Sequence, residues 1–392
     1  MRERWKEEYM SRNDYGENIS EIRRRSYFDI SLLIAIVFLV GFGLLMVYST
    51  SSYDAMNKYG DSMYYLKNQA FACFLGFFAI LVIIFFDYRL LMNFYWFIFA
   101  IGVFTVLLVR VPGVGMEING ARRWIRVAGQ SIQPAEILKI SMIIWLATVL
   151  SKNGRKLQEL KFYAMMWVVV VVSCALVYLL TDNLSSAIII GGIAFVMIFV
   201  AAPKNTTMWT VGIGIVAALL IGVALLSGTG FRSNRVKVWR NPEKYSKSGG
   251  FQVLQGLYAI GSGGFFGKGI GHSVQKLGFV PEPQNDMVFT IICEELGLFG
   301  AVAVIVMFVF VLHRMYIIAL NAYDLFGSLC VIGVMTHIAL QVVLNIAVVT
   351  NSIPNTGVTL PFLSYGGTSA VFIMAEIGLV LSVSRKIKVF RR

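Results

Sequence analysis

Long apolar runs separated by short polar segments fill most of this chain. Each run is close to the ~20 residues that a helix needs to cross ~30 Å of hydrocarbon. We therefore expect an all-α polytopic membrane protein with ten transmembrane helices. They are expected near residues 29–49, 69–87, 92–111, 134–151, 163–181, 185–202, 208–227, 287–312, 325–349 and 364–384.

The composition supports this interpretation. Hydrophobic residues make up 57% of the chain and charged residues only 14%, whereas a soluble domain carries roughly a quarter of its residues as charged types. No polar block is long enough to bury a core of its own. The four cysteines lie inside apolar runs without disulfide or metal spacing, so we expect small buried hydrophobes at Cys73, Cys174, Cys293 and Cys330.

Lys and Arg concentrate in three segments, and this bias predicts the orientation. The polar N-terminal segment holds seven, the segment after the fourth run four, and the C-terminal tail five. With ten spans all three share one side, so both termini are expected in the cytoplasm. No cleavage pattern follows the first run, which we interpret as a retained span. The expected parts are a cytoplasmic tail 1–28, a membrane domain 29–384 and a basic cytoplasmic tail 385–392.

The large segment 228–286, between helices 7 and 8, then lies outside the cell despite its positive charge. It carries eight Lys and Arg against three carboxylates. It is either a tolerated solvated loop or an electropositive surface that recruits phosphate-bearing lipid, and we favour the second. Residues 251–260 have helical spacing. Nucleic acid is not an expected partner on this face, and no phosphate-loop motif implies ATP.

Several ionisable residues lie within the apolar runs, where charges are costly and often functional. Glu136 and Lys139 are three residues apart on one helical face, so we expect a structural ion pair that fixes their span. Glu376 is expected to find an Arg or Lys partner. Glu294 and Glu295 fall inside the eighth run.

Asp286 stands at the boundary where the eighth run begins. Two interpretations remain open from the residues alone. Asp286 caps the helix, because Asp accepts backbone N–H groups at helix starts, or it is a general base at the membrane–water boundary. A cap would lower its pKa, and partial burial would raise it.

Several long motifs occur in an order that resembles the SEDS family (shape, elongation, division and sporulation), whose members include FtsW, RodA and SpoVE. The similarity is greater to the FtsW branch and covers nearly all of the membrane region. The motifs are LLMVYSTSS, Lys67 with Gln69, GARRWI, QPAEILKI, GLYAIGSGGFFGKGIGHSVQKLGFVPEPQNDMVF with EELGLFG, and IPNTGVTLPFLSYGGTS.

The resemblance implies an inverting peptidoglycan glycosyltransferase that polymerises lipid II for septal cell-wall synthesis. Asp286 matches the family's essential aspartate, and its implied role is to deprotonate the acceptor 4-hydroxyl while undecaprenyl pyrophosphate leaves. A divalent cation, Mg²⁺ or Mn²⁺, is implied without a legible ligand set, and no organic cofactor is expected. The alternatives are a lipid II flippase, or an elongation or sporulation polymerase of the RodA or SpoVE type.

The resemblance also implies partners and a location. The partners are lipid II, a class B penicillin-binding protein (a transpeptidase), other divisome proteins and membrane lipid. The protein would be a multi-pass protein of the bacterial plasma membrane with its active site on the extracytoplasmic face. A pyrophosphate leaving group needs cations, and the expected ones are Lys67, Arg122, Arg123, Arg126 and Lys268. The other expected substrate-binding residues are Gln255, Glu282 and Ser364.

One segment departs from the family pattern. The family carries Pro-Asp-x-Gly-Thr/Ser between spans five and six, whereas this chain has Asp182 at the Pro position and Asn183 at the Asp position. This departure argues against an essential carboxylate at that place and leaves the role of Asp286 unaffected.

Overall fold

The structure of the protein is a computed structural model. It describes residues 25–118, 121–127, 130–154, 156–203, 206, 209–214, 216, 231–247 and 249–389. The expected tails, 1–28 and 385–392, therefore fall partly outside the described residues.

Within this described part, eight helices are long and apolar enough to cross a membrane. A ninth, α4 (Tyr95–Leu108), is apolar but shorter than its expected run. The expected run 208–227 lies mostly outside the described residues. These helices confirm an all-helical, multi-pass membrane protein. The eight are α2 (Ile30–Tyr59), α3 (Tyr64–Phe85), α5 (Pro134–Lys152), α6 (Leu160–Thr181), α7 (Leu184–Ala201), α11 (Val288–Asn321), α12 (Leu325–Val349) and α13 (Thr368–Arg385).

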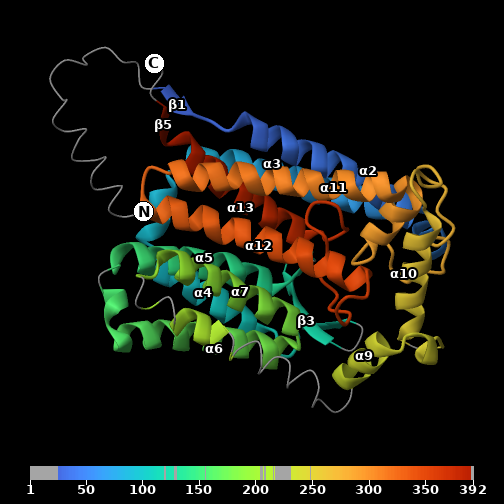
Figure 1. Cartoon of the computed structure of the whole chain (residues 1–392), viewed down its shortest axis with the longest axis horizontal. Coiled ribbons are helices and arrows are strands. Elements are labelled where there is room, and N and C mark those ends of the chain that lie inside the picture. The colour runs from blue at the N-terminus through green and yellow to red at the C-terminus, as the bar shows by residue number, and fades with distance from the viewer. Residues whose placement is uncertain are drawn as a thin grey trace.

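The long helices run side by side, so the molecule has two ends (Figure 1). At one end, strand β1 (Arg25–Tyr27) pairs antiparallel with β5 (Ile387–Val389), which brings the two ends of the described chain together. The opposite end, at the right in Figure 1, carries β3 (Ala121–Val127), α9 (Phe231–Arg240) and α10 (Gly250–Ser262). We call this the loop end.

Local signals in the sequence set several helix boundaries. Asp29 caps α2 by accepting the backbone N–H of Leu32 at 2.9 Å, and α2 ends at Gly60 in the left-handed conformation. Asp324 caps α12 in the same way through Gly327. Asp29 also forms a buried ion pair with Arg314 of α11 at 2.7 Å, which ties α2 to α11.

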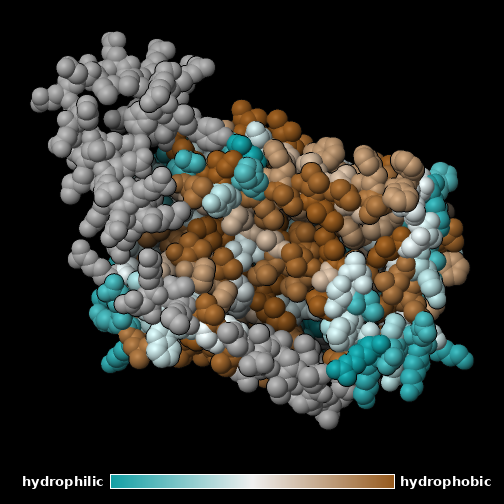
Figure 2. Space-filling view, viewed as in Figure 1, coloured by the Kyte–Doolittle hydropathy of each residue, from teal (hydrophilic) through white to brown (hydrophobic). Residues whose placement is uncertain are grey.

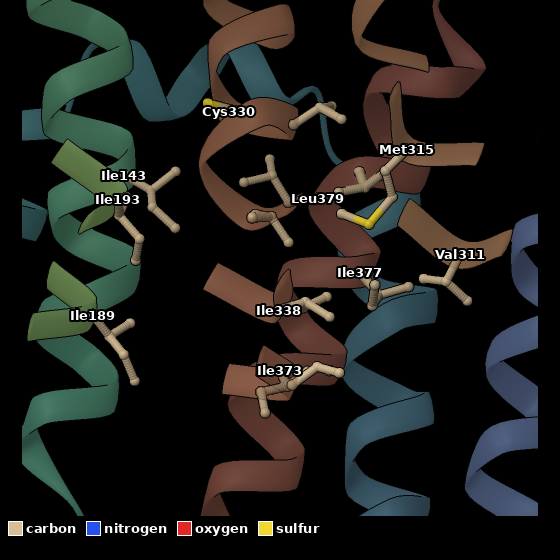
Figure 3. Close-up of a cluster of buried hydrophobic side chains, with 14 of the residues drawn as sticks. Ile143, Ile189, Ile193, Val311, Met315, Cys330, Ile338, Ile373, Ile377 and Leu379 are labelled. Carbon is tan, nitrogen blue, oxygen red and sulfur yellow. The ribbon is translucent and has the colours of Figure 1, made fainter. Parts of the chain in front are cut away.

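Helix α5 lies at the centre of the packing, because 83% of the residues in its most apolar stretch are buried. It contacts α4, α7 and α12, while α13 packs on α3 and α11 on α12. Isoleucines from α5, α7, α12 and α13 gather in this core (Figure 3). Apolar side chains also cover the outer surface of the bundle, and polar residues collect at its ends (Figure 2). Such a surface suits a lipid environment.

The loop end also contains a small sheet that the apolar pattern did not predict. Strands β2 (Gly115–Ile118), β3 (Ala121–Val127) and β4 (Gln130–Ile132) form an antiparallel sheet in the order β2-β3-β4. The expected helix at 251–260 is confirmed as α10. Short 3₁₀ turns complete the fold at η1 (Tyr88–Met92), η2 (Lys156–Gln158) and η3 (Glu243–Tyr245).

Candidate active site at the loop end of helix α11

Asp286 lies two residues before α11, in the turn that leads into this helix. It does not cap the helix: the N-cap residue is Met287, and no side-chain hydrogen bond closes this end. Its carboxylate is half-buried and makes no ion pair among the described residues. The capping interpretation of Asp286 is therefore wrong.

Burial is the main electrostatic influence on Asp286. It raises the pKa of this carboxyl to about 6, because a charged carboxylate is poorly solvated there. The like charge of Glu282 also raises this pKa, and the cation of Arg235 lowers it. Asp286 therefore changes charge close to neutral pH, as a general base should.

The turn that carries Asp286 is held from two sides. The side-chain amide of Asn345, on α12, donates to the backbone carbonyl of Asp286 at 2.8 Å. The backbone N–H of Tyr365 donates to the carbonyl of Gln284 at 2.8 Å. Residues 350–367, between α12 and α13, thus form one wall of the site.

Helix α9 forms a second wall. Arg235 Nη1 donates to the carbonyl of Asn355 at 3.0 Å, and Trp239 Nε1 donates to that of Asn351 at 2.9 Å. Neither Asn345 nor Arg235 is among the predicted site residues. A polar Asn inside the apolar run 325–349 was a signal that could have identified Asn345.

The Gly-rich segment after α10 enters a break in α11. Gly297 has φ 66° and ψ −162°, which interrupts the helix. The backbone N–H of Leu298 donates to Gly264 at 2.9 Å, and that of Lys268 donates to the carbonyl of Glu294 at 3.0 Å. A Cβ on Gly267 would collide with the backbone of Glu295, so the close approach requires glycine.

Two adjacent buried carboxylates fix this segment to α11. Glu294 pairs with Lys268 at 2.7 Å and also accepts a hydrogen bond from Ser273. Glu295 pairs with Lys276 at 2.7 Å and accepts from Ser49 of α2 at 2.8 Å. We call these two ion pairs, with Ser49 and Ser273, the carboxylate clamp.

The predicted cations occupy different settings. Lys268 belongs to the clamp, with its side chain 34% exposed. Lys67 is 65% exposed and pairs with Asp61 at 2.7 Å, and Arg122 is 51% exposed and pairs with Glu117 at 3.0 Å. Arg126 is also exposed, and Arg123 donates to the carbonyl of Asp182 at 3.1 Å. All lie at the loop end, and their contacts with substrate stay predictions.

The remaining predicted substrate residues lie nearer to the Asp286 turn. Glu282 is exposed, with φ 46°, and accepts a hydrogen bond from Asn285 at 2.8 Å. Gln255 is half-buried on α10. Ser364 is buried, and its hydroxyl accepts the N–H of Leu360 at 2.8 Å, which is a structural bond. Gln69 braces the same segment by accepting from Gly366 and Gly367.

The expected pair of Glu136 and Lys139 is present and buried, with 2.7 Å between Oε1 and Nζ. It continues further than predicted. Lys139 Nζ lies 2.9 Å from His337 Nε2, and His337 Nδ1 lies 2.8 Å from Glu376. Glu376 therefore pairs with a histidine rather than with the expected Arg or Lys. We call these four residues the buried quartet.

The departure from the family motif has a structural explanation. Asn183 caps α7 by accepting the backbone N–H of Ser186 at 3.0 Å. Asp182 ends α6 with φ 50° and lies 3.7 Å from Arg110. Both residues thus stabilise the connection between α6 and α7.

The described residues contain no group of three or more His, Cys, Asp or Glu side chains placed to hold a metal ion. A cation at this site would need other ligands. Near Asp286, the side-chain oxygens of Gln284 and Asn345 are buried without a hydrogen-bond partner among the described residues. Mg²⁺ usually binds through one or two carboxylates and substrate phosphates, so these two amide oxygens do not define a metal site.

Comparison with known proteins gives a consistent result. A family model described as "Cell cycle protein", of the FtsW/RodA/SpoVE family, matches residues 30–389. Stage V sporulation protein E of Bacillus subtilis is 38% identical over 361 residues, covering 91% of this chain and 97% of that protein. The probable peptidoglycan glycosyltransferase FtsW of the same organism is 37% identical over 369 residues, covering 92% and 91%.

Two solved structures share the fold. A chain from a peptidoglycan synthase complex that coordinates polymerization and crosslinking superposes with a TM-score of 0.75 at 25% identity, covering 91% of this chain and 98% of that one. The rod shape determining protein RodA of Thermus thermophilus superposes with a TM-score of 0.67 at 26% identity, covering 91% and 97%. The chain belongs to the FtsW/RodA/SpoVE family.

Proposed function

We propose that this protein polymerises lipid II into glycan strands, with Asp286 as the general base. The enzyme class, peptidoglycan glycosyltransferase, follows from membership of the family and from the names of its relatives. The finer proposal concerns the substrate, the base and the leaving group. In this reaction Asp286 takes the proton of the acceptor 4-hydroxyl, the new glycosidic bond forms with inversion, and undecaprenyl pyrophosphate leaves.

One observation carries the proposal. Asp286 is half-buried, is not consumed by a helix cap or an ion pair within the described residues, and has its pKa raised to about 6. A base with such a pKa is mostly ionised at neutral pH and still has a useful affinity for a proton. An inverting reaction that expels a pyrophosphate needs one base, so a second catalytic carboxylate is not required.

Cations at the loop end support a pyrophosphate leaving group. Lys67 and Arg122 keep exposed charges there. A bound Mg²⁺ or Mn²⁺ would neutralise charge on the leaving oxygen.

The test uses purified protein and labelled lipid II in detergent, with and without a class B penicillin-binding protein. The parent should make glycan strands, and Asp286→Ala should make none. Glycan synthesis by Asp286→Ala at the parent rate would overturn the base assignment. Omitting divalent cations with a chelator, then restoring Mg²⁺ or Mn²⁺, tests the metal proposal in the same assay.

We place the activity in septal wall synthesis on the extracytoplasmic face of the plasma membrane. The motifs favour an FtsW role, although a SpoVE and an FtsW are similar to the chain at nearly equal identity. Complementation separates the roles. The gene should restore division in FtsW-depleted Bacillus subtilis. Rescue of a strain lacking Stage V sporulation protein E, without rescue of division, would contradict the septal role.

The partner we propose is a class B penicillin-binding protein, together with other divisome proteins. The support is the similarity to a chain of a peptidoglycan synthase complex. Co-purification of the two membrane proteins from cells expressing both would test the pairing. Independent elution at every detergent concentration used would contradict it.

A second candidate function, transport of lipid II across the membrane, is favoured by the buried quartet. Four ionisable side chains from α5, α12 and α13 connect inside the bundle, and intramembrane ionisable groups often serve transport. Transport requires a sealed bilayer, whereas polymerisation does not. Glycan synthesis in detergent, with no lipid II movement in sealed vesicles, would reject the transport role.

A further inference from the structure

We propose that Asn345 is a positioning residue that holds the backbone of Asp286 in its reactive place. This inference rests on the proposed function, because it concerns the geometry of the same base. Asn345 lies in α12, before the motif IPNTGVTLPFLSYGGTS.

Asn345 is an amide in the last turns of α12 that is only 1% exposed. Both protons of its Nδ2 are used. One goes to the carbonyl of Asp286 at 2.8 Å, and the other goes to the carbonyl of Val358 at 2.7 Å. One side chain therefore joins α12, the turn before α11 and the segment 350–367.

The Asp286 turn depends on such a fixed point. Its carboxylate makes no ion pair among the described residues, and the charges of Arg235 and Glu282 act on it with opposite effects. Met287 offers no side-chain cap to the helix that follows. The backbone bond from Asn345 and the bond between Tyr365 and Gln284 join the Asp286 turn to the segments packed beside it.

Burial makes these bonds strong constraints. A carbonyl inside the protein that loses its donor is left unpaired, which is unfavourable. The turn would then relax toward other donors and shift the carboxylate. A misplacement of about 1 Å in an active site can cost roughly 10²-fold in rate. Loss of Asn345 should therefore act on kcat more than on substrate binding.

The experiment compares Asn345→Leu with Thr336→Val in the full-length protein. Thr336 is a matched control, because it is also a buried polar residue of α12, and its hydroxyl donates to the carbonyl of Ile332 in the same helix. With labelled lipid II in detergent, we expect Asn345→Leu to lower kcat by about 10- to 100-fold. The KM should stay within about threefold, and Thr336→Val should keep parental values.

A second variant keeps the inference falsifiable if Asn345→Leu fails to fold. Asn345→Asp is nearly the same size but carries a negative charge close to Asp286. Its carboxylate cannot donate to the carbonyls of Asp286 and Val358, so kcat should fall as in Asn345→Leu while the KM stays near the parental value. The kcat is measured per folded protein, so that partial unfolding alone would leave it at the parental value.

The outcomes separate this inference from the proposed function. A parental kcat in Asn345→Leu or in Asn345→Asp would overturn the positioning role. If Asp286→Ala is inactive while Asn345→Leu is fully active, Asp286 is the base but Asn345 does not position it. If Asp286→Ala is fully active, the proposed function itself fails.

Discussion

Three carboxylates at the start of α11 stand in contrasting environments. Glu294 and Glu295 are fully buried, and each pairs with a lysine at 2.7 Å. Asp286 lies in the turn just before the helix, is half-buried, and makes no ion pair among the described residues. The first two hold the Gly-rich segment in place, and the third remains available for a proton.

The difference shows that neighbouring carboxylates in one short segment have a structural role at Glu294 and Glu295 and a chemical role at Asp286. A buried charge needs a partner, because desolvation alone costs several kcal/mol. Once paired, a carboxylate such as Glu295 has little freedom to react. Asp286 needs no ion-pair partner because it keeps partial access to solvent, and it stays free to react. Its burial still raises its pKa to about 6.

The largest effect is expected from Asp286→Asn, which keeps the size of the side chain and removes the base. General base catalysis contributes about 10²- to 10⁴-fold, so kcat should fall by that factor. The unfolding temperature should stay near the parental value, because no ion pair is broken. Kinetics with labelled lipid II and differential scanning fluorimetry test both halves. If Asp286→Asn keeps the parental activity, Asp286 is not the base and does not differ in function from the carboxylates of the clamp.

The carboxylate clamp should show the opposite behaviour. In Lys276→Met, the carboxylate of Glu295 loses its cation inside the protein, where Lys276 itself is only 7% exposed. Removing one partner of a buried pair costs about 3–5 kcal/mol, so the unfolding temperature should drop markedly. Lys58→Met is the matched control, because its pair with Asp54 is more exposed. Equal stability of the two variants would contradict a structural role for the clamp.

Much of this arrangement could be read from the chain because it is local. Apolar runs predicted the helices, and a spacing of three residues predicted the pair of Glu136 and Lys139. The helical spacing at 251–260 predicted α10. Each of these signals lies within one element, where periodicity directly reports which residues share a face.

The remaining features depend on segments that are distant in the sequence. The break at Gly297 is stabilised by backbone groups about thirty residues earlier, so nothing in the run 287–312 reveals it. The partners of Glu294 and Glu295 come from the Gly-rich segment and from α2. The choice between cap and base for Asp286 likewise required the helix boundary, which falls at Val288.

A smaller effect is expected on the pH dependence of kcat/KM, which reports the pKa of Asp286. If its ionised form is the base, kcat/KM should rise with pH up to about 6 and then level off. The charge of Glu282 contributes to this raised pKa. Glu282→Gln should therefore move the acidic limb to lower pH. Glu243→Gln, which removes an exposed carboxylate of the same segment, is the control and should leave the limb in place. If the acidic limb stays at the same pH in Glu282→Gln, the titrating group is not Asp286.

The smallest effect is expected from the exposed cations, which have neither the burial of the clamp nor the placement of Asp286. Lys67 and Arg122 each pair with a carboxylate in solvent, where screening weakens charge interactions. Lys67→Met and Arg122→Gln should raise the KM for lipid II by roughly two- to fivefold without changing kcat. The effect should shrink as salt increases, because exposed charges more than ~10 Å apart are screened at 0.1 M. A change in kcat that persists at high salt would instead place that cation at the reacting pyrophosphate.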